Sequence, residues 1–355
     1  MGKQQVVICK DLKTELEAFL SSLSYDRIYV LTDTNTLDKC YPFIKDIPLL
    51  VDAPVLTVGA GDSHKDIEQV ISLWRHLCDM GASRNSLLIN LGGGMITDMG
   101  GFVGATFKRG MKTINIPTTL MASVDAAVGG KTGINFNGLK NEVGSFYPPL
   151  CVFICNEFLR TLDWDNILSG YAEMIKHALI SSDKEIYSNV MSFNPDSGDC
   201  IERLDELVAE SVAVKEHIVE EDPKEYGIRK ALNLGHTIGH AYESLSFKKG
   251  VPLLHGHAVA AGLVAELYLS YKVCDFPMGD LTQIVHYIKG LYPAFVYSCD
   301  DYEALYELMT HDKKNEGGII NFTLLSGIGE VQINQSVDKE TIIASLDFYR
   351  ESFGF

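Results

Sequence analysis

The chain has 355 residues, of which 46% are hydrophobic and 22% are charged, so it is long and apolar enough for two folded domains. Its formal net charge of −17 opposes binding to nucleic acid or to an anionic membrane, because like charges repel. No apolar run approaches the roughly 18 residues that span a bilayer, and the N-terminal apolar run is too short for a secretory signal. We therefore expect a cytoplasmic protein with reduced cysteines.

The first 160 residues alternate short β-rich runs with helical segments, which is the pattern of a parallel α/β domain. Helices are expected at 66–78 and 95–107. Strands are expected at 27–32, 55–58, 86–90, 113–116 and 151–155. The predicted fold class of this part is an α/β domain with a Rossmann-like parallel sheet.

A glycine-rich loop, residues 92–101, follows the predicted strand at 86–90 and opens a helix. Exposed N–H groups and the positive end of the helix dipole favour an anion there, such as the pyrophosphate of a dinucleotide. Thr97 stands where the Gly-x-Gly-x-x-Gly pattern needs glycine, and a tight turn explains the triplet equally well. Asp33, after the first strand, could bind a ribose or form an Asx turn. Both alternatives stay open at this point.

Charged side chains are dense between residues 107 and 141, without the pairing typical of helices. A surface loop can have this composition. Further cations interrupt apolar segments later in the chain, namely Lys176, Lys215, Arg229 and the pair Lys313-Lys314. In an acidic protein such cations indicate a polyanionic substrate, because phosphate and carboxylate groups bind Lys and Arg through charge-assisted hydrogen bonds.

From about residue 162 the pattern changes to long helical periodicities. Helices are expected at 165–180, 201–220, 229–246, 255–273 and 279–291, and a small hairpin at 319–325 and 330–333. The sequence therefore predicts a mostly α-helical C-terminal domain, with the boundary near residue 160 placed by this change in composition.

Histidines in the helical part have the spacing of a metal centre. His236 and His240 lie four residues apart on one helical face, and His255 opens the next apolar run. Catalytic zinc commonly uses three protein ligands, and Glu173, in an apolar helical segment, supplies a carboxylate. Each of these residues alone is more commonly a core or solvated group. Together they favour Zn²⁺, with Co²⁺ or Mn²⁺ as alternatives.

With these residues in view, the chain resembles the 3-dehydroquinate synthase family of sugar-phosphate cyclases over nearly its whole length. The motifs that carry the resemblance are residues 92–103, 108–110, 116–120, 124–125, 129–132, 140–141, 172–176, 229–243, 255–256 and 312–314. Their order and spacing match the family at many separate sites.

The resemblance implies that Glu173, His236 and His255 hold Zn²⁺ and that His240 is an active-site base or proton shuttle. It implies further catalytic roles for Asp125, Lys131, Asn141 and Lys176. The NAD contacts that it implies are Asp33, Asp62, Lys65, Gly93, Gly94, Met95, Asp98, Thr118, Thr119, Lys140 and Thr161. The substrate contacts are Arg109, Lys131, Asn141, Lys215, Arg229, Asn233, Lys313 and Lys314.

The family reaction converts 3-deoxy-D-arabino-heptulosonate 7-phosphate to 3-dehydroquinate and phosphate in the shikimate pathway, with NAD reduced and reoxidised in each turnover. The resemblance thus implies a lyase and a homodimer that binds an anionic sugar phosphate. Residues 1–160 would bind NAD, and residues 161–355 would bind metal and substrate. The alternatives are another sugar-phosphate cyclase, a metal-dependent polyol dehydrogenase of the related iron-type group, and a non-catalytic protein that keeps the fold.

Three positions depart from the family pattern. Asp62 stands where the family usually has Glu, and His257 replaces a common Glu after the His-Gly pair. Residues 161–166 lack the Pro, Arg and Glu that usually follow Thr-Leu. These departures leave the expected metal ligands in place and concern the groups around them.

Overall fold

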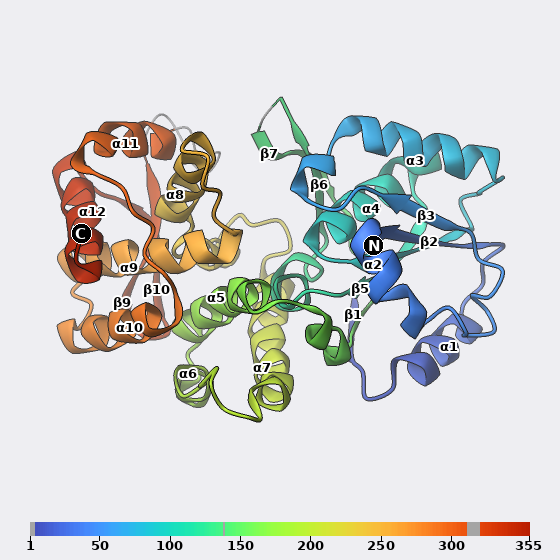
Figure 1. Ribbon diagram of the computed structural model, residues 1–355, viewed down its shortest axis with the longest axis horizontal. Coiled ribbons are helices and arrows are strands. Elements are labelled where there is room, and N and C mark those ends of the chain that lie inside the picture. The colour runs from blue at the N-terminus through green and yellow to red at the C-terminus, as the bar shows by residue number, and fades with distance from the viewer. Residues whose placement is uncertain (1–3, 138, 311–319) are drawn as a thin grey trace. The chain divides into compact units, whose positions relative to one another are not determined.

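The computed structural model describes residues 4–137, 139–310 and 320–355 (Figure 1). The chain divides into two compact units, Met1–Asp163 and Trp164–Phe355. Lys313 and Lys314, two of the predicted substrate contacts, lie outside the described residues.

The first unit is built on a six-stranded parallel sheet with the strand order β1-β8-β5-β4-β2-β3. The strands are β1 (Gln5–Ile8), β2 (Ile28–Asp33), β3 (Val55–Val58), β4 (Leu87–Gly92), β5 (Lys112–Pro117) and β8 (Cys151–Ile154). Strands β2, β4 and β8 are buried along their whole length, as expected for a sheet covered on both faces. The predicted α/β fold is confirmed. The partly exposed edge strand β1 was not predicted.

Helices cover both faces of this sheet. Leu16 and Leu20 of α1 (Leu12–Ser22) pack with Val30 and Ile89 on one face. The other face, which presents Leu88, packs against α3 (Ile67–Asp79) and α4 (Gly94–Thr106). The shorter helical elements are α2 (Thr34–Lys39), η1 (Tyr41–Phe43), η2 (Asp62–His64), η3 (Phe107–Arg109), η4 (Ala122–Ala126) and η5 (Asn156–Thr161).

An antiparallel hairpin occupies much of the charged segment that reads as a loop in the sequence. Its strands are β6 (Lys131–Phe136) and β7 (Leu139–Phe146), and β6 packs against α4. Nearly all residues of β7 are exposed, so β7 lacks the alternation of apolar and polar residues by which a half-buried strand is recognised.

The second unit is mostly helical, as predicted. Its helices are α5 (Trp164–Ile180), α6 (Lys184–Met191), α7 (Cys200–Glu221), η6 (Ile228–Asn233), α8 (His236–Lys248), α9 (His255–Val273), α10 (Met278–Leu291), η7 (Cys299–Asp301), α11 (Tyr302–Thr310) and α12 (Lys339–Phe353). The predicted hairpin is also present, as β9 (Asn321–Gly327) and β10 (Glu330–Ser336). Helix α9 packs against α5, α8, α10 and α12 (Figure 1).

The single helix expected at 229–246 is wrong, because the chain breaks at Gly235. A 3₁₀ helix, η6, ends at Asn233, and α8 begins at His236. Gly235 has a φ of +78°, a left-handed conformation that an α-helix cannot contain and that glycine adopts without strain. His236 therefore stands at the first position of a new helix.

Helices α8 and α9 approach so closely that their backbones are in contact. A Cβ atom on Gly262 of α9 would lie 2.1 Å from the carbonyl oxygen of Gly235 and 2.7 Å from the amide nitrogen of Gly239. Only a residue without a side chain fits at this crossing. The contact fixes the distance between the two helices that carry the candidate metal ligands.

We expect Gly262→Ala to lower the free energy of unfolding by about 1–3 kcal/mol or more, because the added methyl group must push two backbones apart. Urea denaturation measures this difference. Gly290→Ala in α10 is the matched control, since a Cβ there meets nothing within 4 Å. It should leave stability unchanged or raise it slightly. Equal stability of the two variants would contradict the proposed backbone contact.

Candidate active site

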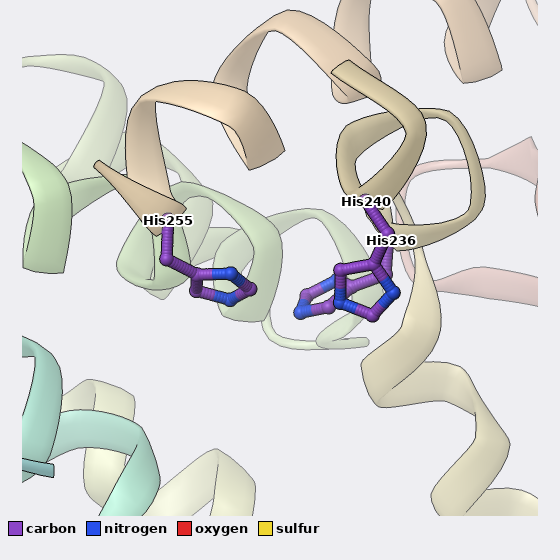
Figure 2. Close-up of side chains that lie close together, drawn as sticks. All are labelled: His236, His240 and His255. Carbon is purple, nitrogen blue, oxygen red and sulfur yellow. The ribbon is translucent and has the colours of Figure 1, made fainter. Parts of the chain in front are cut away.

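Three histidines of the second unit turn their rings toward one another (Figure 2). His236 and His240 come from the first turns of α8, and His255 is the first residue of α9. The ring centroids are 5.3 Å apart for His236 and His240, 5.3 Å for His236 and His255, and 5.8 Å for His240 and His255. One nitrogen of each ring lies within 4.8 Å of the others, which is close enough for a shared metal ion.

The carboxylate of Glu173, on α5, is fully buried beside these rings. Its Oε1 atom lies 3.5 Å from Nε2 of His236 and 3.6 Å from Nε2 of His255. Lys176, one helical turn further along α5, forms an ion pair with Oε2. The structure thus brings together the three predicted metal ligands of this unit, together with the predicted groups His240 and Lys176.

Hydrogen bonds orient two of the imidazoles. Nδ1 of His236 lies 3.0 Å from the carbonyl oxygen of Leu234, and Nδ1 of His255 lies 3.2 Å from Oε2 of Glu243. Both partners are hydrogen-bond acceptors, so each Nδ1 is the donor of its pair, and each Nε2 is the ring nitrogen that faces Glu173, where a metal ion would bind. Two imidazole nitrogens and one carboxylate oxygen are a donor set that suits Zn²⁺ or Co²⁺, and the carboxylate and carbonyl behind them are the usual supports of such ligands.

Burial and charge act in opposite directions on these groups. Burial raises the pKa of Glu173, but Lys176, His236 and His255 together bring it well below the ordinary value. Burial lowers the pKa of His236 well below its ordinary value, although Glu173 opposes this shift. Burial also lowers the pKa of His255, but the hydrogen bonds to Glu173 and Glu243 dominate and raise it to about 10. Without metal, His255 therefore carries a proton at neutral pH.

Glu266 of α9 is an important residue that the sequence analysis missed. Its fully buried carboxylate accepts hydrogen bonds from two backbone N–H groups at the start of α8, those of Gly235 at 2.6 Å and Ile238 at 2.9 Å. Gly235 has no side chain that could cap this helix, so Glu266 serves as the cap. The signal that selected Glu173, a lone acid in an apolar helix, was also present at Glu266.

The other predicted residues that the structure describes in the second unit lie on α7 and η6. Lys215 and Arg229 are buried, and Nη1 of Arg229 donates to the carbonyl oxygen of Pro223 at 2.8 Å. Asn233, at the end of η6, donates to Glu225 at 3.4 Å. His257, which departs from the family pattern, packs its ring edge-on against Tyr292 in the core.

In the first unit, five predicted residues form one polar cluster. Nζ of Lys65, which is 4% exposed, donates to Oδ2 of Asp98 at 2.6 Å and to Oδ1 of Asn141. Nζ of Lys140 lies 3.4 Å from Oδ2 of Asp62. The cluster joins the turn after β3, helix α4 and strand β7, so Asp62 in place of Glu still takes part in an ion pair here.

The glycine loop has the expected geometry. Strand β4 ends at Gly92, and α4 begins at Gly94. The cap residue, Gly93, has no side chain to bond the first turn of α4. The N–H of Ile96 donates to the carbonyl oxygen of Gly93 at 3.0 Å, which leaves the N–H groups of Gly94 and Met95 as the ones that an anion could use. Met95 is in this first turn. A Cβ on Gly93 would lie 3.0 Å from the methyl group of Thr119, which brings another predicted cofactor residue beside the loop.

Two further predicted cofactor residues, Thr118 and Thr161, contact the side chain of Cys40. Burial raises the pKa of its thiol, and hydrogen bonds with Thr161 and Thr118 partly offset the shift. Its Sγ atom lies 4.0 Å from the hydroxyl oxygen of Thr161. Asp33 accepts hydrogen bonds from Asn35 and Thr36 through Oδ1 and caps α2, as in the Asx-turn alternative, so a ribose would have to use its other oxygen.

Arg109 lies in a strained stretch of backbone. Lys108 and Arg109 have φ values of +48° and +67°, left-handed conformations that side-chain-bearing residues seldom adopt. Such strain is concentrated at functional positions in proteins.

Two further predicted residues of the first unit lie near the hairpin in the sequence. Asp125 lies on η4, and Lys131 is the first residue of β6.

Metal binding to the metal-free protein should release about one proton per ion near pH 8. His255 is protonated below its pKa of about 10 and must be neutral to bind metal. Proton release should therefore disappear as the pH rises past that value. Calorimetric titrations with Zn²⁺ in two buffers of different ionisation enthalpy measure the released proton. Identical heats in both buffers would mean that His255 is already neutral or is not a ligand.

We expect Glu266→Gln to lower the free energy of unfolding by about 1–3 kcal/mol, because an amide offers one acceptor oxygen where two N–H groups need one each. Metal content, measured on the folded variant, should fall as well. Glu303→Gln is the control, since the Glu303 side chain is 77% exposed and pairs with Lys339 at the surface. If Glu266→Gln were as stable as this control, Glu266 would not be the cap of α8.

No helix among the described residues has the length and apolarity to cross a membrane.

Comparisons with solved structures agree with the fold of the chain. The structure superposes on 2-epi-5-epi-valiolone synthase from Streptomyces hygroscopicus subsp. jinggangensis, which has NAD⁺ and Zn²⁺ bound, with a TM-score of 0.87, 22% identity and coverage of 99% of this chain and 98% of the other. For 2-deoxy-scyllo-inosose synthase complexed with carbaglucose-6-phosphate, NAD⁺ and Co²⁺, the values are 0.81, 21%, 98% and 96%. An iron-containing alcohol dehydrogenase from Thermotoga maritima gives 0.67, 14%, 99% and 98%. At these identities the likeness shows the fold.

Sequence comparisons identify the family. Family models described as 3-dehydroquinate synthase N-terminal and C-terminal match residues 55–169 and 170–315. A 3-dehydroquinate synthase from Parabacteroides distasonis is 70% identical over 354 residues, which is 100% of both chains. One from Pyrococcus furiosus is 41% identical over 345 residues, covering 96% of this chain and 98% of its own. The chain therefore belongs to the 3-dehydroquinate synthase family.

Proposed function

We propose that this protein is a 3-dehydroquinate synthase, a carbon–oxygen lyase that converts 3-deoxy-D-arabino-heptulosonate 7-phosphate to 3-dehydroquinate and inorganic phosphate. The observation that carries the proposal is the convergence of Glu173, His236 and His255, beside His240 and Lys176, in a member of this family. A cytoplasmic homodimer is the form that we propose for the enzyme.

Glu173, His236 and His255 would hold the metal ion, which we propose to be Zn²⁺ with Co²⁺ as an alternative. The bound metal would supply a Lewis acid for a secondary hydroxyl, and bound NAD would supply a reversible hydride acceptor for the same carbon. Glu243 and the carbonyl of Leu234 keep the Nε2 atoms of His255 and His236 available. Glu266 keeps α8 in register with α9.

The first unit would hold NAD. The first turn of α4, with Gly93, Gly94 and Met95, would bind the pyrophosphate through its N–H groups. The other proposed contacts are the polar side chains of Asp33, Asp62, Lys65, Asp98, Thr118, Thr119, Lys140 and Thr161. Lys65 would place Asp98 in this site, because its ammonium is bonded to that carboxylate.

Cationic and amide side chains would bind the anionic substrate. We assign Arg109, Lys131 and Asn141 to the phosphate that leaves, where hydrogen bonds stabilise its developing charge. Lys215, Arg229, Asn233 and the Lys313-Lys314 pair would hold the rest of the substrate. Lys176, which forms an ion pair with Glu173, would orient a carboxylate or hydroxyl of the substrate. His240 would move the proton of the hydroxyl that is oxidised, with Asp125 as a further acid–base group.

The decisive experiment is a coupled assay for phosphate and dehydroquinate from the heptulosonate, with and without a chelator. We expect both products in equal amounts, loss of activity with chelator, and recovery on addition of Zn²⁺ or Co²⁺. Release of phosphate from sedoheptulose 7-phosphate but not from the heptulosonate would favour another sugar-phosphate cyclase. Steady accumulation of NADH would favour a dehydrogenase, and metal uptake without turnover would favour a non-catalytic protein.

His240→Ala should keep a near-normal zinc content while turnover falls about 100-fold or more, because the variant loses proton transfer and keeps the three ligands. His236→Ala is the comparison, since it removes a proposed ligand and should lose the metal. Metal analysis of both purified variants checks this. Equal metal loss in the two variants would make His240 a ligand.

A further inference from the structure

Asn135 on β6 has no role in the function proposed above. It nevertheless forms hydrogen bonds with two segments that carry proposed cofactor and substrate contacts. Its backbone N–H donates to the carbonyl oxygen of Lys65 at 2.8 Å. Its side-chain Nδ2 donates to the carbonyl oxygen of Asp62 at 3.2 Å and to Oδ2 of the same residue at 3.1 Å. Its Oδ1 accepts a hydrogen bond from the backbone N–H of Asn141 at 3.0 Å. One residue thus joins the turn after β3 to strand β7.

Asn135, Lys65 and Asn141 form a closed ring of hydrogen bonds. The ammonium of Lys65 donates to Oδ1 of Asn141, whose N–H is already held by Asn135. Asn141 is therefore fixed at its backbone and at its side chain. Its φ of +51° lies in the left-handed region, which asparagine tolerates and which supporting contacts keep in one conformation. The ring supplies those contacts, so the placement of Asn141 depends on the turn that contains Asp62 and Lys65.

The ring requires an amide at position 135. Its nitrogen faces a carbonyl and a carboxylate of Asp62, and its oxygen faces an N–H group, so donor and acceptor are used together. Aspartate would keep the acceptor but place a second carboxylate beside that of Asp62. Asn135 and Lys140 both contact Oδ2 of the Asp62 carboxylate. Oδ1 could then accept a hydrogen bond from another group, such as a ribose hydroxyl.

We propose that Asn135 is a positioning residue through which cofactor binding at the Asp62–Lys65 turn fixes Asn141 for the substrate. The inference rests on the proposed function, because it takes Asp62 and Lys65 as cofactor contacts and Asn141 as a substrate contact. Asn135 itself would contact neither ligand. Cofactor and substrate affinity are thereby linked inside the first unit: NAD that orders the turn also orders the strand that presents Asn141.

The test compares the full-length protein with Asn135→Ala and Asn135→Asp. Calorimetric titration measures the dissociation constant of NAD, and hydrogen–deuterium exchange with and without NAD follows the amides of residues 139–146. We expect NAD to bind the alanine variant about three- to tenfold more weakly, the effect of losing one net hydrogen bond. NAD should slow exchange at 139–146 in the wild type and not in either variant.

The two variants separate the two ends of the amide. Asn135→Asp keeps the acceptor for Asn141, so its exchange at 139–146 without NAD should match the wild type, whereas that of Asn135→Ala should be faster. Asn85→Ala is the control, because Asn85 uses its backbone groups in the turn at 83–86. It should leave the affinity and both exchange patterns unchanged. Thermal unfolding establishes that each variant is folded, and if Asn135→Ala does not fold, Asn135→Asp carries the test.

Wild-type affinity and wild-type NAD-dependent protection in a folded Asn135 variant would overturn the coupling while leaving the proposed function intact. Failure of the wild-type protein to bind NAD would overturn both. In turnover, the substrate KM should rise in Asn135→Ala at saturating NAD, because Asn141 is misplaced even when the cofactor is bound.

Discussion

The second unit is organised around an ionised carboxylate that water does not reach. A buried carboxylate destabilises a fold by several kcal/mol unless cations and hydrogen bonds compensate. Glu173 is compensated by Lys176 on its own helix and by imidazoles at the starts of α8 and α9. Three helices must therefore meet in one register. The backbone contact at Gly262 and the cap provided by Glu266 hold that register, so groups that are not themselves donors decide whether the donors converge.

The first unit contains a buried group of the opposite charge, which also needs compensating partners. Lys65 is a nearly buried ammonium whose partners, Asp98 and Asn141, come from α4 and β7. Because this cation is shared, the turn after β3, the helix behind the glycine loop and the hairpin cannot move independently. Asn135 adds neutral hydrogen bonds to the same assembly. This hairpin, whose second strand is mostly exposed and which would be marginal alone, is thereby fixed to the sheet domain.

The sequence predicted those helices, strands and side-chain clusters that depend on the spacing of residues close together in the chain. The strand at 55–58 and the helix at 255–273 were predicted with the bounds that the structure has, since each is a periodic run with clear ends. The spacing of His236 and His240, and the lone acid Glu173, pointed to a donor cluster before any family was considered. The break at Gly235, the cap from Glu266 and the bonds of Asn135 arise from contacts between distant segments. No periodicity records such contacts. The hairpin β6–β7 escaped because its second strand is exposed on both faces.

His236 and His255 are each the first residue of their helix, so most of each helix follows the metal-binding side chain in the sequence. Lengthening α9 at its far end would leave the imidazole of His255 where it is. An insertion of one residue between His236 and His240 would instead swing one ring by about 100° around the axis of α8. Changes in helix length at the C-terminal ends of α8 and α9 therefore leave the metal-binding side chains in place. Insertions at the N-terminal ends displace them.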